Sequence, residues 1–397
     1  MGQRMRTVEQ HISAAIEGVG LLPALDVTLA ESRGCVLAED VSSPTDWPHF
    51  SQCAEFGYAV RTADVSAGTP LTVIDEVPAG SSASAAIGPG KAIRVHAGAP
   101  LPGAADAVAP DAMATRNPDG TVRIRGPLGS GSGVIPVGST APAGKLLLEA
   151  GRRIDERAVG ILAAIGRSRV SVRPRPRVVL VTVGDELVPV GSALGSGLLH
   201  ESTSTLLAAA VASLDGVPYR VGPLRDDEAA IADSLDDQQV RADLLIVTGG
   251  VASPTDSVVG VVERIADLSF DTGSTSLGMF GYGRVGEDGI PLLCLPGDPV
   301  RAFSLFRVLV APIISTMMGQ PIHAPRELPL AVPVERRSTT QLLLARVDRN
   351  STVQPILSDL PSLLDLSHAD ALIRIPSGSG SLPVGTPVPA LPLQGPR

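Results

Sequence analysis

The chain has 397 residues, with 32 lysines and arginines against 41 aspartates and glutamates, which gives a formal net charge of −9. At roughly 100–200 residues per domain, this length predicts two to four domains. The basic residues are scattered singly, so the chain lacks the concentrated Lys/Arg face that nucleic-acid binding requires. Nucleic acid is therefore excluded as a partner. A small phosphorylated ligand is not, because a helix N-terminus binds anions without net positive charge.

The first half of the chain combines helical and β patterns. Apolar residues at helical spacing predict helices over Thr7–Glu17 and Ile154–Ile165, and residues 22–38 are interpreted as a short strand, a turn and a further helical piece. From residue 46 onward, Val, Ile and Thr alternate with turn residues, which predicts short strands. We expect a split helical domain formed by residues 1–45 and 148–176, with a β domain of residues 46–147 inserted into it.

The second half has the clearest pattern, because four apolar runs alternate with helical patterns. Fully apolar strands separated by helices indicate a doubly wound parallel sheet covered on both faces, so the fold class is multidomain α/β. Short strands return after Gly319 and predict a C-terminal β domain of residues 323–397. The α/β domain is assigned to residues 177–322, with strands at 178–183, 218–222, 243–248 and 291–296 and helices at 202–214, 226–236, 256–267 and 299–318.

The cysteines and the lengths of the apolar runs indicate in which cellular compartment the protein is expected. The three cysteines lie far apart and form no CxxC pair, so neither a zinc knuckle nor a disulfide framework is predicted, and a reducing cytoplasm is the expected location. No apolar run approaches the roughly 18–20 residues of a membrane span, so we expect no membrane insertion. The N-terminus leads into a polar helix rather than a signal-peptide core. The cysteines are Cys35, Cys53 and Cys294.

Glycine-rich loops follow three of the predicted strands. In open α/β sheets, ligands bind beyond the carboxyl ends of the strands, so we expect these loops to converge on one edge of the sheet. Glycines let backbone approach a ligand closely, and the amides of a helix N-terminus suit a phosphate or another oxyanion. The loop residues of interest are Gly184, Asp185 and Glu186, then Thr248, Gly249 and Gly250, then Pro296, Gly297 and Pro299.

Acidic side chains accompany these loops. Glu186, Asp226 and Asp256 are suited to Mg²⁺, which takes carboxylate and phosphate oxygens. Each feature also has a structural explanation: Thr-Gly-Gly after a strand is typical of a tight turn, and Asp226 and Asp256 occupy positions expected of N-caps, worth about 1 kcal/mol each. Glu186 has no obvious packing task at a strand end. The residue types alone leave both interpretations open.

Five segments of the sequence together resemble the MoeA family, the molybdopterin molybdenumtransferases, which includes the E domain of gephyrin. The resemblance begins at the N-terminal helix and covers almost the whole chain, and the predicted domain order agrees with it. The combination of GAPLPxxADAV, TxGDEL, TGGV and LPGxPV is specific to that family. The matching segments are 50–60 (FSQCAEFGYAV), 96–108 (HAGAPLPGAADAV), 181–188 (VTVGDELV), 243–256 and 294–301.

The resemblance implies a fold, an activity and site residues. Members of the family have a split helical domain, an inserted β domain, a molybdopterin-binding α/β domain and a C-terminal β domain, and work as elongated dimers. They insert molybdate into adenylated molybdopterin, releasing AMP, with Mg²⁺ held by acidic residues. Carried over to this sequence, the resemblance implies catalytic roles for Asp185, Glu186, Asp226 and Asp256, metal binding by Glu186 and Asp256, and molybdopterin binding by Gly184, Thr248, Gly249, Gly250, Pro296, Gly297 and Pro299.

The chain departs from the family pattern at several positions that the family uses for chemistry. Two carboxylates of one loop are replaced by Ser51 and Phe56, and the lysine-bearing PGKP segment has no counterpart in residues 272–285. Glu55 and Glu201 are candidate substitutes. The TGGVSxGxxD loop is one residue short, and IYDSN has become LHEST at 199–203. Other replacements are Gln52 for Asn, Ala97 for Thr, Thr140 for an acid, and Arg301 for the small residue after LPGxPV.

Two functions from different classes follow. The first is a molybdenumtransferase that binds molybdopterin-AMP and molybdate at the loops after residues 183, 248 and 295. The second is a catalytically impaired, dimeric scaffold that binds a protein or peptide near its C-terminal domain, as the E domain of gephyrin binds receptor tails. An unrelated nucleotide-binding α/β enzyme is a third interpretation. The surviving motifs favour the first function, which is the one we expect.

Overall fold

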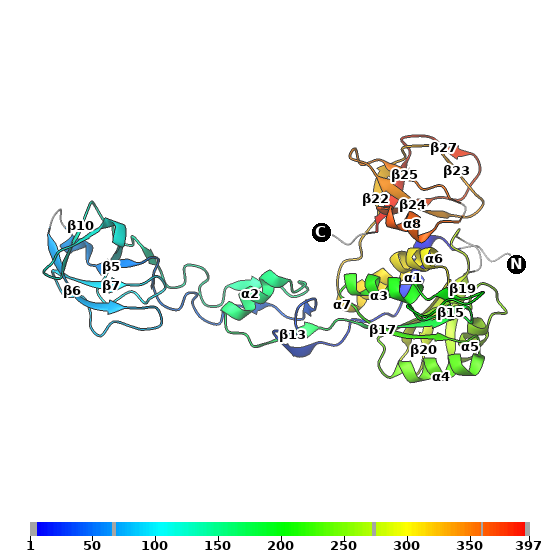
Figure 1. Cartoon of the computed structure of the whole chain (residues 1–397), viewed down its shortest axis with the longest axis horizontal. Coiled ribbons are helices and arrows are strands. Elements are labelled where there is room, and N and C mark those ends of the chain that lie inside the picture. The colour runs from blue at the N-terminus through cyan, green and yellow to red at the C-terminus, as the bar shows by residue number, and fades with distance from the viewer. Residues whose placement is uncertain (1–5, 66–68, 272–274, 359, 394–397) are drawn as a thin grey trace. The chain divides into compact units, whose positions relative to one another are not determined.

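The computed structural model describes residues 6–65, 69–271, 275–358 and 360–393, with backbone only for 267–271 (Figure 1). These residues form two units, which are described separately. The inserted unit consists of Thr28–Glu31 and Glu39–Val170, and the main unit of Met1–Val27, Ser32–Ala38 and Ser171–Arg397. The finer division into four domains stays a prediction.

A six-stranded sheet dominates the inserted unit, in the order β8-β5-β7-β6-β10-β9. Successive side chains of a strand point to opposite faces, so Tyr58 and Val60 of β5 join one apolar cluster while Ala59 joins another. The sheet is therefore packed on both faces. Its strands are β5 (Gly57–Val60), β6 (Pro70–Val77), β7 (Lys91–Val95), β8 (Ala107–Pro110), β9 (Ala114–Arg116) and β10 (Thr121–Ile124), accompanied by η1 (Thr62–Asp64), η2 (Asp111–Met113) and the short strands β3 (Val41–Ser42), β4 (Gln52–Cys53), β11 (Val134–Ile135) and β12 (Leu146–Leu148).

The helix predicted at 154–165 is α2 (Glu156–Ala164) of the inserted unit. Asp155 begins it, because its Oδ1 accepts the backbone N–H of Ala158 at 2.8 Å. Ala158 and Leu162, four residues apart and hence on one face, are its buried side chains. The helix is confirmed, and its start is determined by the cap.

The main unit contains a mixed sheet in the order β17-β14-β18-β21-β20-β19. Its first four strands pair in parallel, as predicted, but β20 is antiparallel to both of its neighbours. β20 and β19, the last two strands of this order, were not predicted, because β20 carries glycines that weaken a strand pattern and β19 overlaps the expected end of a helix. The strands are β14 (Arg177–Val183), β17 (Val217–Leu224), β18 (Leu244–Thr248), β19 (Ala266–Asp271), β20 (Phe280–Val285) and β21 (Ile290–Leu295).

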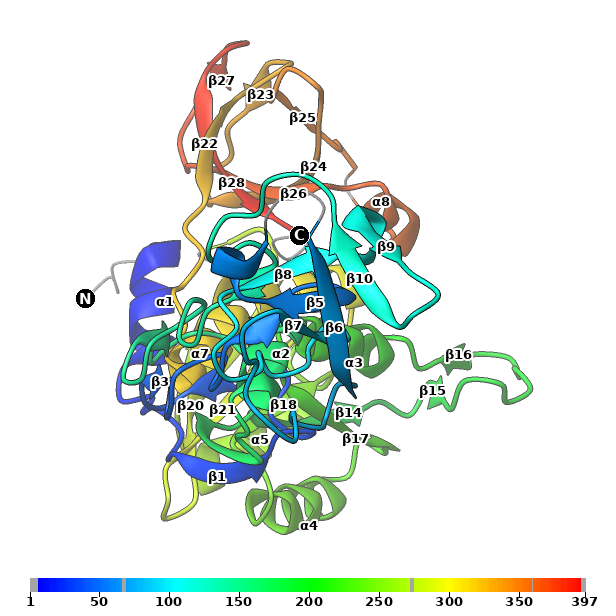
Figure 2. The ribbon, with the colours of Figure 1, turned by 90° about the vertical axis from the view of Figure 1, so that its left-hand side faces the viewer.

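Helices cover both faces of this sheet, as Figure 2 shows. Val178 and Leu180 of β14 pack with Leu207 of α3 and Phe306, whereas Val179 of the same strand packs with α4 and α5. The alternation confirms a doubly covered sheet. The elements involved are α3 (Thr203–Ser213), α4 (Glu228–Gln239), α5 (Ser257–Ile265), and the continuous helix made of α6 (Pro299–Leu305), η3 (Phe306–Val310) and α7 (Ala311–Met318), with a small ribbon of β15 (Leu187–Val188) and β16 (Leu199–His200) beside them.

The continuous helix Pro299–Met318 is long and apolar enough to cross a membrane, which contradicts the expectation that no apolar run approaches that length. The arginines within it, Arg301 and Arg307, made the run look shorter in the sequence. Most of the helix is buried within the fold, as expected of a core helix. It ends at Gly319, which adopts the left-handed conformation with φ +70°.

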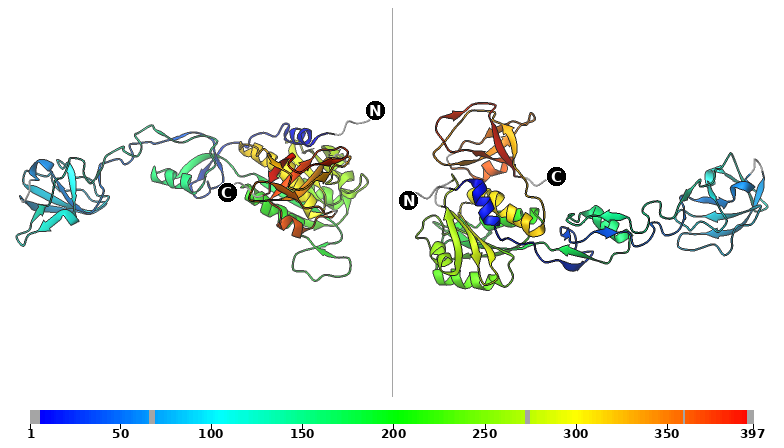
Figure 3. Two further views of the ribbon diagram at one scale, coloured as in Figure 1. Left: turned by 90° about the horizontal axis from the view of Figure 1, so that it is seen from above. Right: turned by 180° about the vertical axis from the view of Figure 1, so that it is seen from behind.

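Two further parts pack against that helix. The N-terminal helix α1 (Val8–Ile16) begins at a capping box made by Thr7 and Gln10 and lies beside η3 and α7 (Figure 3).

No helix follows in residues 22–38. The structure has β1 (Leu25–Thr28) and β2 (Val36–Leu37) there, and both share a sheet with β13 (Arg169–Arg173). The helical piece predicted there is wrong, because pairing with β13 decides the conformation. The C-terminal β region contains β22 (Arg326–Pro329), β23 (Val334–Glu335), β24 (Gln341–Val347), β25 (Val353–Pro355), α8 (Leu363–Ser367), β26 (Ala371–Ile375), β27 (Ser381–Leu382) and β28 (Pro387–Pro392).

The cap of α2 makes the stability of the inserted unit sensitive to acid. The Ala158 amide, followed by the Arg157 guanidinium, lowers the pKa of Asp155 to about 2, against about 3.9 for an unperturbed Asp. Because the folded-state pKa is the lower one, this carboxylate stabilises the fold above about pH 4 and loses that effect as the pH falls toward 2. We expect Asp155→Asn, which keeps a capping oxygen but does not titrate, to lower the thermal unfolding midpoint at pH 7 and to approach the wild type near pH 2.5. For Glu156→Gln, the exposed neighbour, the difference from the wild type should not shrink in this window; equal behaviour of the two variants would contradict the assignment.

Candidate functional site

The carboxyl ends of the central strands are in register. Thr182 of β14 lies opposite Thr248 of β18, which lies opposite Leu295 of β21. The loops that start at residues 184, 249 and 296 therefore leave the sheet at one level, as predicted. Both threonines are buried, and Thr248 Oγ1 lies 3.4 Å from Thr182 Oγ1.

Backbone contacts hold these loops together and require glycine. Gly249 has φ +87°, and a Cβ on it would lie 2.1 Å from the carbonyl oxygen of Val183. A Cβ on Gly297 would lie 3.4 Å from the Cα of Gly249, whose N–H donates to Leu295 O at 3.2 Å. Gly250 has φ +61°, and a Cβ on it would lie 2.6 Å from Cγ2 of Val258. These contacts give the Thr-Gly-Gly motif a structural role and produce an edge of bare backbone, which we call the glycine edge (Val183–Gly184, Gly249–Gly250 and Gly297).

Two predicted acidic residues meet beside the glycine edge. The backbone N–H of Asp185 donates to Asp226 Oδ2 at 3.3 Å, and the N–H of Asp226 donates to Asp185 Oδ1 at 3.4 Å. Ser257 Oγ donates to Asp226 Oδ1 at 3.0 Å. The loops after β14 and β17 and the start of α5 are thus joined, and the exposed carboxylates of Asp185 and Asp226 lie together.

The N-cap assignments need correction. Asp227, not Asp226, caps α4, since its Oδ1 accepts the N–H of Ala230 at 2.9 Å. Asp256 occupies the N-cap position of α5, but its side chain does not cap that helix. Its Oδ2 instead accepts the N–H groups of Ala252 at 2.7 Å and Ser253 at 3.1 Å. The TGGVASPTD loop is therefore closed on Asp256.

Glu186 folds back over the loop that carries it. Its carboxylate oxygens lie 2.7 and 2.9 Å from the point where a Cβ on Gly184 would be. The side chain is exposed. Among the residues that the structure describes, no three His, Cys, Asp or Glu side chains are grouped closely enough to hold a metal, and no contact brings Glu186 to Asp256.

The LHEST segment has structural tasks that the sequence did not reveal. Both oxygens of the buried Glu201 are bonded to Ser204, one to its N–H and one to its hydroxyl, each at 2.6 Å. Thr203 Oγ1 donates to the carbonyl oxygen of Gly297 at 2.9 Å and so fixes the turn before α6. Asp298 then caps that helix, accepting the N–H of Arg301 at 2.8 Å. A threonine at the start of a predicted helix was the only signal of this link.

In the inserted unit, Phe56 belongs to a charged cluster. The Arg94 guanidinium lies 4.6 Å from the centre of the Phe56 ring, and the His96 ring meets it edge-on at 5.0 Å. Glu76 Oε1 lies 2.8 Å from His96 Nε2, and the hydrogen bond with His96 lowers the pKa of Glu76. Ser51 Oγ accepts the N–H of Val137 at 3.2 Å. Phe56 and Ser51, which stand where the family has acids, therefore both take part in local contacts.

The close contact at Gly249 predicts a specific cost for adding a methyl group. Gly249→Ala places a Cβ against Val183 O in a left-handed backbone conformation, and we expect it to lower the free energy of unfolding by about 3 kcal/mol. Gly197→Ala is the matched control, because Gly197 has φ +80° with nothing within 4 Å of a Cβ, and it should cost only about 1 kcal/mol. Urea denaturation measures both. Equal losses in the two variants would mean that the glycine edge is not tightly packed.

The sequence of the chain is similar to known protein families and to characterised proteins. Residues 6–166 match the family described as the MoeA N-terminal region (domain I and II), and residues 179–316 match the probable molybdopterin binding domain. "Molybdopterin molybdenumtransferase 1" of Mycobacterium tuberculosis is 31% identical over 96% of this chain and 97% of its own length. "Molybdopterin molybdenumtransferase 2" of the same organism is 34% identical over 80% of this chain and 81% of its own.

The solved structures agree with the sequence relatives. The crystal structure of a molybdopterin biosynthesis MoeA protein from Pyrococcus horikosii superposes with a TM-score of 0.80 at 26% identity, covering 99% of this chain and 100% of that one. Fold and sequence similarity over nearly the whole length agree with the predicted resemblance. The chain belongs to the MoeA family of molybdopterin molybdenumtransferases.

Proposed function

We propose that this protein is an enzyme of molybdenum cofactor biosynthesis that inserts molybdate into adenylated molybdopterin and releases AMP. The observation that carries the proposal is the glycine edge with the adjoining Asp185–Asp226 pair, kept in a chain that aligns over 96% of its length with a molybdopterin molybdenumtransferase. The exposed backbone of Gly297 and the half-buried backbone of Gly250 let a substrate's pyrophosphate approach the strand ends. Thr248, Gly250, Pro296 and Pro299 lie on or next to the same loops, and we assign them to molybdopterin binding.

Magnesium forms part of the proposal. Mg²⁺ keeps several waters and binds through one or two carboxylates plus substrate phosphates, so a site need not contain three protein ligands. The paired, exposed carboxylates of Asp185 and Asp226 fit that requirement, and Glu186 and Asp256 lie on the adjoining loops. Bound there, the ion would neutralise charge on the phosphates. Asp226 keeps its orientation through Ser257.

The replaced acids reduce the expected rate. Removing one well-placed electrostatic group costs about 10²–10³ in rate, and Phe56 and Ser51 stand where the family has acids. Glu201 does not compensate, because Ser204 binds both of its oxygens. Glu55, which is exposed beside Phe56, is the remaining candidate substitute. We therefore propose a transferase that works slowly.

Assembly and compartment complete the proposal. We infer a homodimer from the family resemblance. A reducing cytoplasm agrees with the three cysteines, which are buried and form no disulfide. Burial raises the pKa of Cys53 to about 11 and that of Cys294 to about 12, which keeps both thiols protonated and unreactive.

The activity is tested with purified protein given molybdopterin-AMP, molybdate and Mg²⁺ while AMP release is followed. We expect turnover in the wild type and a loss of about tenfold or more in Glu186→Gln and in Asp226→Asn, since each removes a charge beside the phosphates. Asp227→Asn is the matched control, because asparagine still caps α4, and its rate should be unchanged. No turnover together with no binding of molybdopterin would refute the enzyme, and full activity of both site variants would refute the assigned residues.

A second candidate function, peptide binding at the C-terminal β region, is favoured by one observation. A largely apolar cavity of about 190 Å³ lies between α1, the long helix and β28, lined by Val8, Ile12, Ile322 and Leu391 among others. Arg307, only 6% exposed, also lines it, and its Nε has no hydrogen-bond partner in the part of the chain that the structure describes. An apolar side chain next to a peptide carbonyl would satisfy both features.

The second function is tested with peptides selected on the wild-type protein from a random display library. Ile322→Asp introduces a charge into the cavity at a residue that is 42% exposed, so we expect it to weaken the selected peptides about tenfold while AMP release is retained. Leu21→Asp, at a similarly exposed leucine outside the cavity, should bind as the wild type does. Peptides that bind Ile322→Asp as tightly as the wild type would eliminate this cavity as their site.

A further inference from the structure

The apolar cavity of about 190 Å³ beside α1, which we call the Arg307 cavity, contains a buried arginine. Arg307 lies in η3, in the middle of the long helix, and is 6% exposed. Its Nη2 donates to the carbonyl oxygen of Pro392 at 2.7 Å, whereas its Nε has no hydrogen-bond partner among the described residues. Burial lowers the pKa of this guanidinium, yet an arginine stays protonated in proteins. A positive charge is therefore held in an apolar environment.

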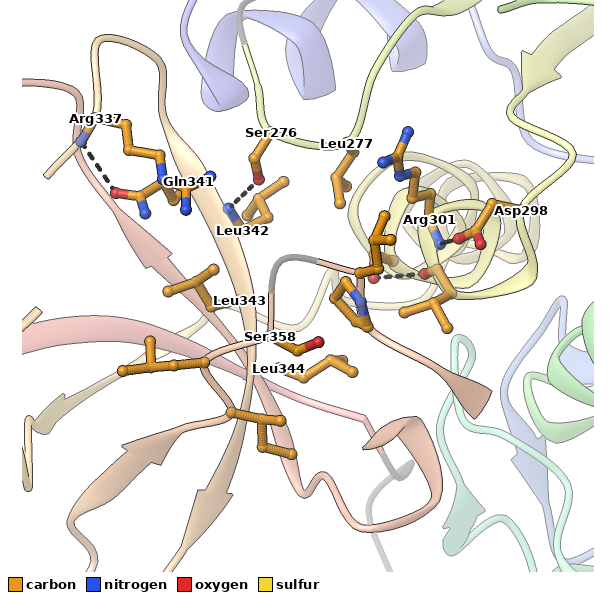
Figure 4. A pocket seen from close by; sticks show the side chains of 16 residues that line it. Ser276, Leu277, Asp298, Arg301, Arg337, Gln341, Leu342, Leu343, Leu344 and Ser358 are labelled. Atoms are coloured by element: carbon orange, nitrogen blue, oxygen red, sulfur yellow. Dashed lines mark hydrogen bonds between the residues drawn. The ribbon is translucent and has the colours of Figure 1, made fainter. Parts of the chain in front are cut away.

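No acidic side chain among the described residues that line the Arg307 cavity balances this charge. The other ionisable groups in the lining are His323 and Arg374, and Arg374 already forms an ion pair with Glu9 of α1. A separate cavity of about 370 Å³ at the beginning of α6 differs, because Asp298 stands beside Arg301 in its lining (Figure 4). A buried charge without a counter-ion is strongly destabilising. A ligand that brings a carboxylate would remove this cost.

The size of the Arg307 cavity limits the apolar part of such a ligand. Pockets for drug-sized ligands measure roughly 300–1,000 Å³, so a cavity of about 190 Å³ is suited to a single side chain. Val8 and Ile12 of α1 line it, together with Leu372 and Leu391 of the C-terminal β region. The carboxylate and the apolar group should therefore belong to one residue. The C-terminal residue of a peptide has both, whereas aspartate and glutamate have the carboxylate without the apolar group.

An open strand edge begins at the same place. Residues 322–325 line the Arg307 cavity and lead directly into β22. β22 is the first strand in the sheet order β22-β28-β26-β24-β25, and within the described ranges its strand partner is β28 alone. The backbone groups of an edge strand can pair with another chain. The residues that precede the C-terminal one therefore have a backbone with which to pair.

We propose that the Arg307 cavity captures the C-terminal residue of a peptide, with its carboxylate bound by Arg307 and its leucine or phenylalanine side chain packed against Ile12 and Leu391. The preceding residues run antiparallel to β22, because the cavity lies at the beginning of that strand. The proposal rests on the second candidate function and deepens it by naming the end of the peptide that is recognised and the residue that recognises it. It is independent of molybdenum transfer.

The test uses hexapeptides selected on the full-length wild type from a random library that displays free C-termini. We expect the selected peptides to end in an apolar residue. Each is then synthesised as the free acid and as the C-terminal amide, and isothermal titration measures both. The amide should bind at least about tenfold more weakly, because it lacks the charge-assisted hydrogen bond to Arg307.

Two arginine variants show whether Arg307 makes the distinction. Arg307→Met keeps an apolar stem of similar length but removes the charge, so it should bind acid and amide equally and about as weakly as the wild type binds the amide. Arg349→Met is the matched control at an exposed arginine in the turn between β24 and β25. It should keep the wild-type preference for the acid.

Thermal unfolding gives a second readout that a merely structural arginine would not produce. Because the unpaired charge destabilises the unliganded fold, Arg307→Met should raise the unfolding midpoint, whereas Arg349→Met should leave it unchanged. The free-acid peptide should raise the midpoint of the wild type but not that of Arg307→Met. A lower midpoint in unliganded Arg307→Met would mean that the arginine serves the fold through Pro392, and would overturn the ligand role.

Further results would overturn the proposal: selected peptides without an apolar C-terminal residue, equal binding of acid and amide by the wild type, or a preference for the acid that Arg307→Met retains. N-acetylleucine binding as tightly as the hexapeptides would also overturn it, because the ligand would then be a small carboxylate. Peptides that lose affinity in Ile322→Asp but bind equally as acid and amide would refute this proposal and leave the second candidate function intact. If no peptide is selected, both are refuted, and AMP release still tests the transferase separately.

Discussion

The contact between Gly249 and the carbonyl oxygen of Val183 is the constraint on which the site depends. A Cβ at residue 249 would lie 2.1 Å from that oxygen, so there is no space for any side chain there. The backbone of the loop after β18 can therefore lie directly on the end of β14, and Gly297 can in turn lie on Gly249. This stacking buries Gly249 and leaves Gly297 exposed at the end of the sheet, and it explains why the edge is built of glycine while the strands beneath it are built of valine, leucine and isoleucine.

Much of this arrangement could be predicted from the sequence. Parallel strands of four to six apolar residues have an unmistakable pattern, and the register of Thr182, Thr248 and Leu295 follows once the strands are adjacent. The pattern failed where tertiary pairing decides the conformation: β20 combines aromatic residues with glycines, and residues 36–37 are held as a strand by β13. Local sequence carries no signal for such pairing, because the partner strand is distant in the chain.

The acids of the site show the same limit more sharply. That Asp185 and Asp226 lie close together follows from topology, but which of Asp226 and Asp227 caps α4 depends on the backbone angles at one junction. The tasks of Glu201 and Thr203 were also invisible, since both depend on distances to atoms that only the folded loop brings near. Family resemblance identified positions, whereas side-chain geometry separated the residues that shape the loops from those that present free oxygens.

The long helix Pro299–Met318 links the site to the end of the chain. Its residues share one apolar cluster with β14 and β18 on one side and with Leu342, Leu344 and Leu372 of the C-terminal β region on the other. The helix begins at the turn that Thr203 fixes to Gly297, so its first residue lies at the glycine edge and its body forms the floor under the last β strands. The C-terminal β region is consequently not a detachable appendage: ending the chain at Gly319 would expose the apolar side of this helix to water, and the element that positions the Gly297 turn would lose its packing. The position of the Gly297 turn therefore depends on the packing of the C-terminal β region against the long helix.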